Sequence, residues 1–246
     1  MKICRFEFEG RIESGVVEGE RVFLFRDNRR QDESFAIEEI SLKPPVAPSK
    51  IVCVGRNYAE HAAELGNDVP SEPLLFLKAP SSIVGDGDRI VIPAASQQVE
   101  HEGELAVVIG RKCAALEEDE DPLRYVLGFT CLNDVTARDL QRRDVQFTRA
   151  KSFDTFCPVG PFIETGLDVS DVRVETRVNG VIKQQGRTSQ MVFPVEFLIR
   201  YISNQMTLFP GDVIATGTPS GVSKLNSGDV CEVEIEGIGT LRNPVV

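Results

Sequence analysis

The chain has no tryptophan and only two histidines, His61 and His101, among its 246 residues. A zinc centre built from several imidazoles is therefore nearly excluded. No apolar run approaches the roughly 18 residues that a membrane-spanning helix needs. The opening residues alternate charged and apolar side chains, unlike the apolar stretch of a signal peptide. We therefore expect a cytoplasmic protein without a membrane partner.

Positive charge is also scarce. The chain carries 27 Lys and Arg residues against 38 Asp and Glu residues, a formal net charge of −11, and its basic residues form no patch. Nucleic acids and anionic membranes recruit proteins through basic patches, so neither is an expected partner. The six cysteines include no CxxC pair and most lie in apolar segments. They are expected to be buried free thiols in a reducing compartment.

Short apolar segments with strand-like alternation dominate the chain and predict a β-dominated α+β fold with short helices. Cys4, Phe6 and Phe8 alternate with charged residues near the N-terminus, and a proline-rich connector covers residues 42–48. We expect a small N-terminal β domain at residues 1–45 and a second domain at residues 46–246. The polar residues 26–34 are expected to form a loop.

The second domain shows clear strand and turn signals. Residues 100–109 and 125–132 are expected to be strands, and Asn179-Gly180 is expected to turn a β-hairpin. The expected helices cover residues 58–65, 135–143 and 194–201. Asn133 is expected to cap the second of these helices.

Two glutamates one residue apart, Glu102 and Glu104, lie in an apolar strand, and Asp134 follows the end of another. Residues i and i+2 of a strand point to the same face. Two neighbouring carboxylates are costly to bury unless they share a cation, so the pattern predicts either a metal site or a solvent-exposed strand. Three oxygen ligands suit Mg²⁺ or Mn²⁺. Glu100 lies on the same face. It is either a fourth acid near the site or an exposed residue at the start of the strand, and we favour the exposed position.

The helix expected after Asp134 places Arg138 and Gln141 on the same helical face as Asp134. A guanidinium there suits a substrate carboxylate, although an ordinary Asp-Arg surface pair has the same spacing. His61 and Glu64 are three residues apart on another expected helix. They form either a general-base pair or a plain helix-surface pair. His101 points away from the glutamates and is interpreted as structural.

Five segments together resemble motifs of the fumarylacetoacetate hydrolase family, in family order over residues 46–246. The matching segments are VGRNYAEH at 54–61, EGELAVVIG at 102–110, NDVTARD at 133–139, KSFDTFCP at 151–158 and GTPSGV at 217–222. The likeness is greatest to short members of the family, namely acylpyruvate hydrolases, oxaloacetate decarboxylases and hydroxyheptadienedioate isomerases.

The resemblance implies a mixed β-sandwich roll with short flanking helices, usually as a homodimer. It implies that Glu102, Glu104 and Asp134 bind Mg²⁺ or Mn²⁺, with Ca²⁺ able to take the same place in crystals. It also implies that His61 and Glu64 form a water-activating dyad. Lys151 would contact the substrate or the developing oxyanion. The further implied substrate contacts are Arg138, Gln141 and Thr218.

The implied chemistry is metal-assisted enolisation of a 2-oxo acid, which serves three reactions. We rank C–C hydrolysis of an acylpyruvate first, with oxaloacetate decarboxylation as an accompanying activity. Isomerisation or tautomerisation of a dienoic or related 2-oxo acid in aromatic catabolism comes second. A non-catalytic, Ca²⁺-binding β module is the alternative of another class.

Overall fold

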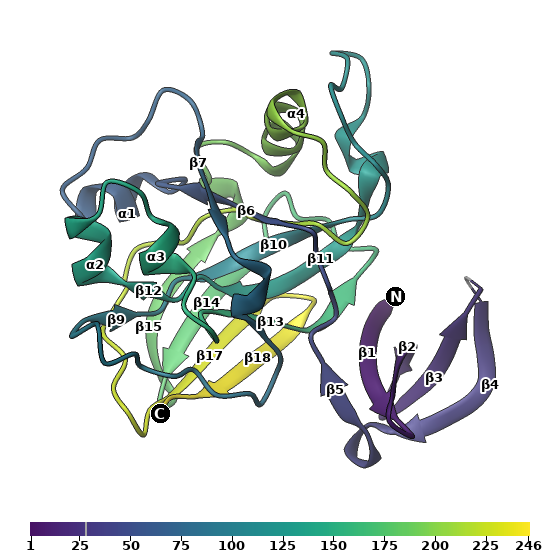
Figure 1. The fold of residues 1–246 in the computed structure, drawn as a ribbon. Coiled ribbons are helices and arrows are strands. Elements are labelled where there is room, and N and C mark those ends of the chain that lie inside the picture. Colours follow the sequence, from purple (N-terminus) through teal and green to yellow (C-terminus); the bar gives the residue numbers. More distant parts are fainter. Residues whose placement is uncertain (28) are drawn as a thin grey trace.

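The computed structural model describes residues 1–27 and 29–246. Strands are the main regular structure in this part of the chain, and they form sheets of 12, four and two strands. The α-helices are short, and α1 (Ala59–Glu64), α2 (Arg138–Arg143) and α3 (Thr148–Lys151) gather at one side of the main body (Figure 1). Short 3₁₀ turns cover Ile37–Glu39, Pro80–Ser82, Pro122–Tyr125 and Thr188–Gln190. The predicted β-dominated α+β class is confirmed.

The first five strands form one end of the large sheet. They are β1 (Lys2–Phe8), β2 (Arg11–Glu18), β3 (Arg21–Arg26), β4 (Arg29–Ala36) and β5 (Ser41–Lys43). Cys4, Phe6, Val22 and Leu24 form their buried core. Strand β1 also pairs with β13 (Cys157–Glu164), so these strands continue the large sheet. The domain division after residue 45 stays a prediction.

The prediction of a loop at residues 26–34 is wrong, because β4 begins at Arg29 and pairs with β3. This strand lies at the edge of the sheet, where charged side chains are tolerated because one side faces solvent. The guanidinium of Arg30 lies over the ring of Phe23, 3.6 Å from its centroid, which adds a cation–π contact. Polarity alone therefore does not distinguish an edge strand from a loop.

Beyond β13, the large sheet continues through five strands in the order β11, β10, β16, β6 and β7. Their bounds are β11 (Val126–Asn133), β10 (Gly103–Ile109), β16 (Val213–Ala215), β6 (Ile51–Gly55) and β7 (Leu74–Lys78). Strand β8 (Ile83–Val84) pairs with β13, and β9 (Val99–Glu100) pairs with β12 (Thr136–Ala137). Helix α3 contacts β7, and helix α2 contacts β9 and β12.

The four-stranded sheet packs against the large sheet and encloses the main core. Its strands, in spatial order, are β15 (Val181–Arg187), β14 (Arg173–Val178), β17 (Val230–Ile235) and β18 (Gly239–Pro244). Leu105 and Val107 of β10 meet Val174 and Val233 of this sheet in one buried cluster. Helix α4 (Val195–Gln205) adds its apolar face to the same cluster. Burial on both faces explains why β10 is apolar throughout residues 105–109.

The predicted hairpin at Asn179-Gly180 is confirmed. Both residues have positive φ, 52° and 76°, and they join the antiparallel strands β14 and β15. This pair of left-handed residues is the geometry of a type I′ turn, which Asn-Gly favours. The predicted helices at residues 58–65 and 194–201 are also confirmed, with the second one extending to Gln205.

Two predicted elements are interrupted. The expected strand at residues 100–109 is broken at residues 101–102 into β9 and β10. The expected helix at residues 135–143 begins only at Arg138, because Thr136 and Ala137 pair with β9 as a short strand. Asn133 is the last residue of β11 rather than a helix cap, and its side-chain oxygen accepts from the Glu102 N–H at 3.0 Å. Tertiary pairing here overrides local helix propensity.

No helix of the described residues is long and apolar enough to cross a bilayer.

The six cysteines are buried and unpaired, as predicted. Burial raises the pKa of Cys4, Cys131, Cys157 and Cys231 to about 12. The reactive thiolate fraction at pH 8 is then about a thousandfold lower than for a thiol with a pKa near 8.5. We expect the native protein to react negligibly with Ellman's reagent within minutes. The protein unfolded in guanidinium chloride should release six equivalents of thionitrobenzoate, one for each cysteine. Rapid reaction of native protein would contradict this burial.

Candidate active site

A cavity of about 190 Å³ lies where the ends of β6, β7 and β10 face the short helices. Glu102, Glu104 and Asp134 line it, and each offers a carboxylate oxygen within 4.8 Å of the others. Their exposed fractions are 5%, 2% and 0%, so the three acids form a buried cluster. Strand alternation places Glu104 on the face of Ala106, toward the cavity. The structure thus brings the three predicted metal ligands together.

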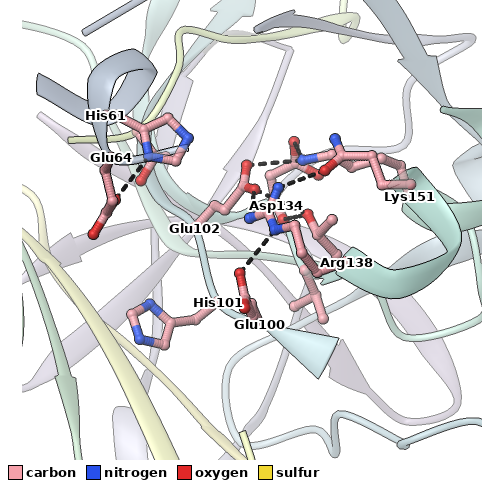
Figure 2. Close-up of polar contacts among 12 residues, drawn as sticks. His61, Glu64, Glu100, His101, Glu102, Asp134, Arg138 and Lys151 are labelled. Carbon is pink, nitrogen blue, oxygen red and sulfur yellow. Dashed lines mark hydrogen bonds and ion pairs between the residues drawn. The ribbon is translucent and has the colours of Figure 1, made fainter. Parts of the chain in front are cut away.

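Two buried lysines hold the acids from one side. The Lys151 ammonium donates to Glu102 Oε2 at 2.8 Å and to Asp134 Oδ2 at 2.7 Å (Figure 2). The Lys78 ammonium donates to Asp134 Oδ1 at 2.5 Å and to the Val135 carbonyl at 3.2 Å. Burial acts to lower the pKa of Lys151, but Asp134 and Glu102 raise it more, so this lysine stays charged. Both lysines can be buried in their charged form because each is paired with a carboxylate.

Arg138 engages the acids from another side. Its Nε donates to Glu100 at 2.8 Å, its Nη2 to Glu102, and its Nη1 to Gln141 Oε1 at 2.5 Å. Burial acts to raise the pKa of Glu102, but the charges of Lys151 and Arg138, with a smaller contribution from His61, lower it below its usual range. Glu102 is therefore ionised. The proposed substrate contact by Arg138 stays a prediction, and its observed contacts orient Glu102.

The expectation that Glu100 is exposed is wrong. Its residue is 7% exposed, and its carboxylate accepts from Arg138 and from Gln98 Nε2 at 2.6 Å. The reason is the pairing of β9 with β12, which covers this end of the strand with the segment that carries Arg138. Glu100 is therefore a buried partner of the arginine.

Glu104 differs from the other two acids of the cluster. In the described part of the chain it forms no ion pair with a lysine or arginine, and its Oε2 accepts the Gly217 N–H at 2.7 Å. Burial raises the pKa of Glu104 well above its usual value, and the nearby charges of Asp134 and Glu102 raise it further. A cation among the three carboxylates would offset this repulsion. All-oxygen donors suit a hard divalent ion, so the residues fit Mg²⁺ or Mn²⁺.

His61 lines the same cavity from helix α1 and is 5% exposed. Its Nδ1 lies 3.3 Å from Glu64 Oε2, which leaves Nε2 as the nitrogen available for proton transfer. Figure 2 shows this pair beside the Glu102 carboxylate. Glu64 also accepts the Gly221 N–H, at 3.0 and 3.2 Å from its two oxygens. His61 and Glu64, spaced as His-x-x-Glu, thus form a pair held in place next to the acids.

The loop 217–221 connects the acid cluster to this pair, because Gly217 bonds to Glu104 and Gly221 bonds to Glu64. Thr218, 2% exposed, lines the cavity and donates to the Gly103 carbonyl at 2.8 Å. Gln184 donates to Thr218 Oγ1 at 2.7 Å and accepts the Gly103 N–H at 3.0 Å. This buried amide therefore joins the loop to the residue between the two glutamates.

His101 lies on the opposite side of the strand, as alternation predicts, and its ring points away from the acids (Figure 2). Its ring nitrogens lie 3.0 Å from Gln184 Oε1 and 2.8 Å from Ser223 Oγ. Burial lowers the pKa of His101, which favours the neutral ring. This histidine supports the fold beneath the site.

Sequence reasoning missed several residues at or beneath the cavity. Lys78 had a usable signal, since it is a lone charge at the end of the apolar segment Leu74–Lys78. Gln184 and Arg142 had none, because their partners Thr218 and Gln98 are distant in the sequence. Arg56 lies in the family motif at 54–61, but its place in the cavity wall was not predicted. These residues are visible only once β15 and the cavity wall are in place.

Comparison with known proteins identifies the family. Residues 50–246 match the family model described as fumarylacetoacetate (FAA) hydrolase C-terminal. The chain therefore belongs to the fumarylacetoacetate hydrolase family of enzymes, as its motifs indicated.

Named relatives span several reactions. The oxaloacetate tautomerase YisK of Bacillus subtilis is 43% identical over 226 residues, covering 86% of this chain and 75% of the relative. The structure of a 5-carboxymethyl-2-hydroxymuconate delta-isomerase from Mycobacterium smegmatis is 41% identical, with a TM-score of 0.92 and coverage of 100% and 99%. A maleylpyruvate hydrolase from Sphingobium sp. SYK-6, in complex with manganese(II) and pyruvate, is 30% identical, with a TM-score of 0.84 and the same coverage.

Proposed function

We propose that this protein is a divalent-metal-dependent enzyme that interconverts the keto and enol forms of a 2-oxo acid of the oxaloacetate type. The sequence alone ranked C–C hydrolysis first. The relative named as an oxaloacetate tautomerase, 43% identical, supports placing tautomerisation ahead. Mg²⁺ or Mn²⁺ is the proposed metal, and the homodimer implied by the family resemblance is also a proposal.

One observation carries this proposal: His61, which is paired with Glu64, and a buried acid triad line the same small cavity. His61 together with Glu102, Glu104 and Asp134 provides both a base and a cation site within reach of one small molecule. A Ca²⁺-binding module would need the acids but would have no use for His61 or Lys151 in the same cavity. The arrangement therefore favours an enzyme over a binding module.

When bound, the divalent cation supplies Lewis-acid polarisation of the 2-oxo group and its carboxylate. His61 removes the proton from C3 of the keto acid, because its Nε2 is unprotonated when Glu64 accepts from Nδ1–H. The electron pair of the broken C–H bond forms the C2–C3 double bond, and the π pair of the C2–oxygen bond moves to the oxygen. That oxygen takes a proton from solvent to complete the enol, and the protonated His61 returns its proton to solvent. The reverse steps return the keto acid.

Lys151 is placed to assist at the oxygen. Its ammonium has three N–H donors, and two of them donate to Glu102 and Asp134. The third is available to an oxygen in the cavity that Lys151 lines. A charged donor in a buried position stabilises developing negative charge on that oxygen.

C–C hydrolysis is the second candidate, and the His61–Glu64 pair favours it. The same base that removes a proton from carbon can remove one from water, which then attacks a distal carbonyl. The maleylpyruvate hydrolase with bound manganese and pyruvate supports this candidate by its name. Oxaloacetate decarboxylation is a further activity to be assayed.

A panel of 2-oxo acids with Mg²⁺ or Mn²⁺ tests the proposal. We expect the protein to accelerate loss of the ultraviolet absorbance of enol-oxaloacetate, and a chelator to remove the effect. Loss of acylpyruvate absorbance with release of pyruvate would instead favour hydrolysis. If the metal-loaded protein changes none of the acids, the proposed enzyme function is wrong.

A further inference from the structure

We propose that Arg142 and Arg56 form a second anion site in the cavity, which selects 2-oxo acids that carry a second carboxylate. This inference rests on the proposed function and specifies its substrate class. Both arginines line the cavity that holds the acid triad, Arg142 from helix α2 and Arg56 from the turn after β6.

In the described residues, no acidic side chain forms an ion pair with either arginine. The acids Glu100, Glu102 and Asp134 are paired with Lys78, Lys151 and Arg138. The Arg142 guanidinium instead contacts a neutral amide, Gln98 Oε1, at 3.2 Å. Within residues 1–27 and 29–246, no ion pair involves Arg142 or Arg56. Their positive charge is therefore available to an anion in the cavity.

The backbone at Arg56 adds an independent observation. Its φ is 57°, a left-handed conformation that a residue with a Cβ adopts at a cost. The neighbouring Asn57, which is fully buried, fixes this turn by donating to the Thr216 carbonyl at 2.7 Å and accepting the Phe193 N–H at 2.8 Å. Such conformations persist where surrounding structure imposes them, and they concentrate at functional sites.

The rest of the cavity suits a short carbon chain between two charged ends. Phe76 and Phe147 line it in an edge-to-face pair with ring centroids 5.6 Å apart. The Lys151 ammonium lies 5.0 Å from the Phe76 ring centroid, which connects this aromatic wall to the acid cluster. A 2-oxo carboxylate at the acid cluster would then leave its far end to the arginines. Apolar walls with a few charged groups are typical of small-molecule sites.

The test compares two substrates that differ at one end. Oxaloacetate and 2-oxobutanoate share the 2-oxo acid and C3, but only oxaloacetate carries the second carboxylate. We expect wild-type protein with Mg²⁺ to enolise oxaloacetate with the higher kcat/KM, measured by enol absorbance and by deuterium exchange at C3. Arg142→Gln should lower kcat/KM for oxaloacetate on the order of tenfold, mainly through KM, and leave 2-oxobutanoate unchanged.

The adjacent Arg143→Gln is the matched control, because Arg143 is exposed like Arg142 but does not line the cavity. This variant should leave kcat/KM unchanged for both substrates. Arg142→Lys should give an intermediate loss for oxaloacetate, since it keeps the charge but loses the planar fork. Arg56→Gln tests the second arginine in the same way.

The two levels of failure are distinguishable. Equal wild-type kcat/KM for both acids, or a loss in Arg142→Gln that is equal for both, would overturn the second anion site while the proposed enzyme function stands. If wild-type protein enolises neither acid, the proposed function fails and this inference fails with it.

Discussion

Replacing Glu104 with glutamine should abolish both metal binding and turnover. Glu104 is the triad acid without a lysine or arginine partner in the described residues, so its charge is the one most dependent on a cation. We expect Mn²⁺ affinity, measured by titration calorimetry, to fall at least a hundredfold. We expect kcat/KM to fall by about 10³ or more, equivalent to about 4 kcal/mol of transition-state stabilisation.

The same substitution should not unfold the metal-free protein. The pKa of Glu104 is raised in the fold because the fold disfavours its charged form, so stability is lost as the pH rises above the ordinary pKa of a glutamate. A neutral amide removes that cost. We therefore expect Tm at pH 7 without metal to be maintained or increased. Glu175→Gln is the matched control for metal binding and turnover, since Glu175 is also a buried acid, 2% exposed, but does not line the cavity. Full activity of Glu104→Gln would contradict the metal role of this residue.

Replacing His61 with alanine should remove proton transfer and keep the metal site. His61 belongs to helix α1 and is not one of the three acids, so Mn²⁺ affinity should change less than threefold. We expect kcat for tautomerisation to fall by about 10² to 10⁴, the usual contribution of a general base. Metal-assisted decarboxylation of oxaloacetate should persist, because loss of CO₂ needs no base.

Two further variants separate the base from its helix. Glu64→Gln keeps a hydrogen-bond acceptor for Nδ1 but removes the charge, and we expect a smaller loss, on the order of tenfold. Glu60→Gln changes an exposed acid of the same helix that does not line the cavity, and it should have little effect. Tautomerisation by His61→Ala at close to the wild-type rate would show that another group carries the proton.

The acid triad was predictable because it depends on local rules. Strand alternation places Glu102 and Glu104 on one side and His101 on the other, and this holds although the strand is broken at residues 101–102. The Asn179-Gly180 hairpin was predictable because its turn chemistry is local. Asp134 was predicted as the third ligand from its place after the end of another apolar strand, and the family motifs implied the same role.

The rest depends on partners far apart in the chain. Thr136 and Ala137 form a strand because β9 pairs with them, and this pairing moves the helix start to Arg138 and buries Glu100. Lys78 meets Asp134 across 56 residues of sequence. Such contacts follow from the order of strands in the sheets, which single-residue patterns do not specify.

A crystal grown with Mn²⁺ tests the central claim most directly, through anomalous diffraction. We expect one strong anomalous peak among Glu102, Glu104 and Asp134, with oxygens at about 2.1–2.2 Å, near the range for hard divalent ions. We also expect that oxalate, an unreactive mimic of a 2-oxo carboxylate, chelates that ion on the side of His61. A peak elsewhere, or none among these acids at saturating Mn²⁺, would contradict the account.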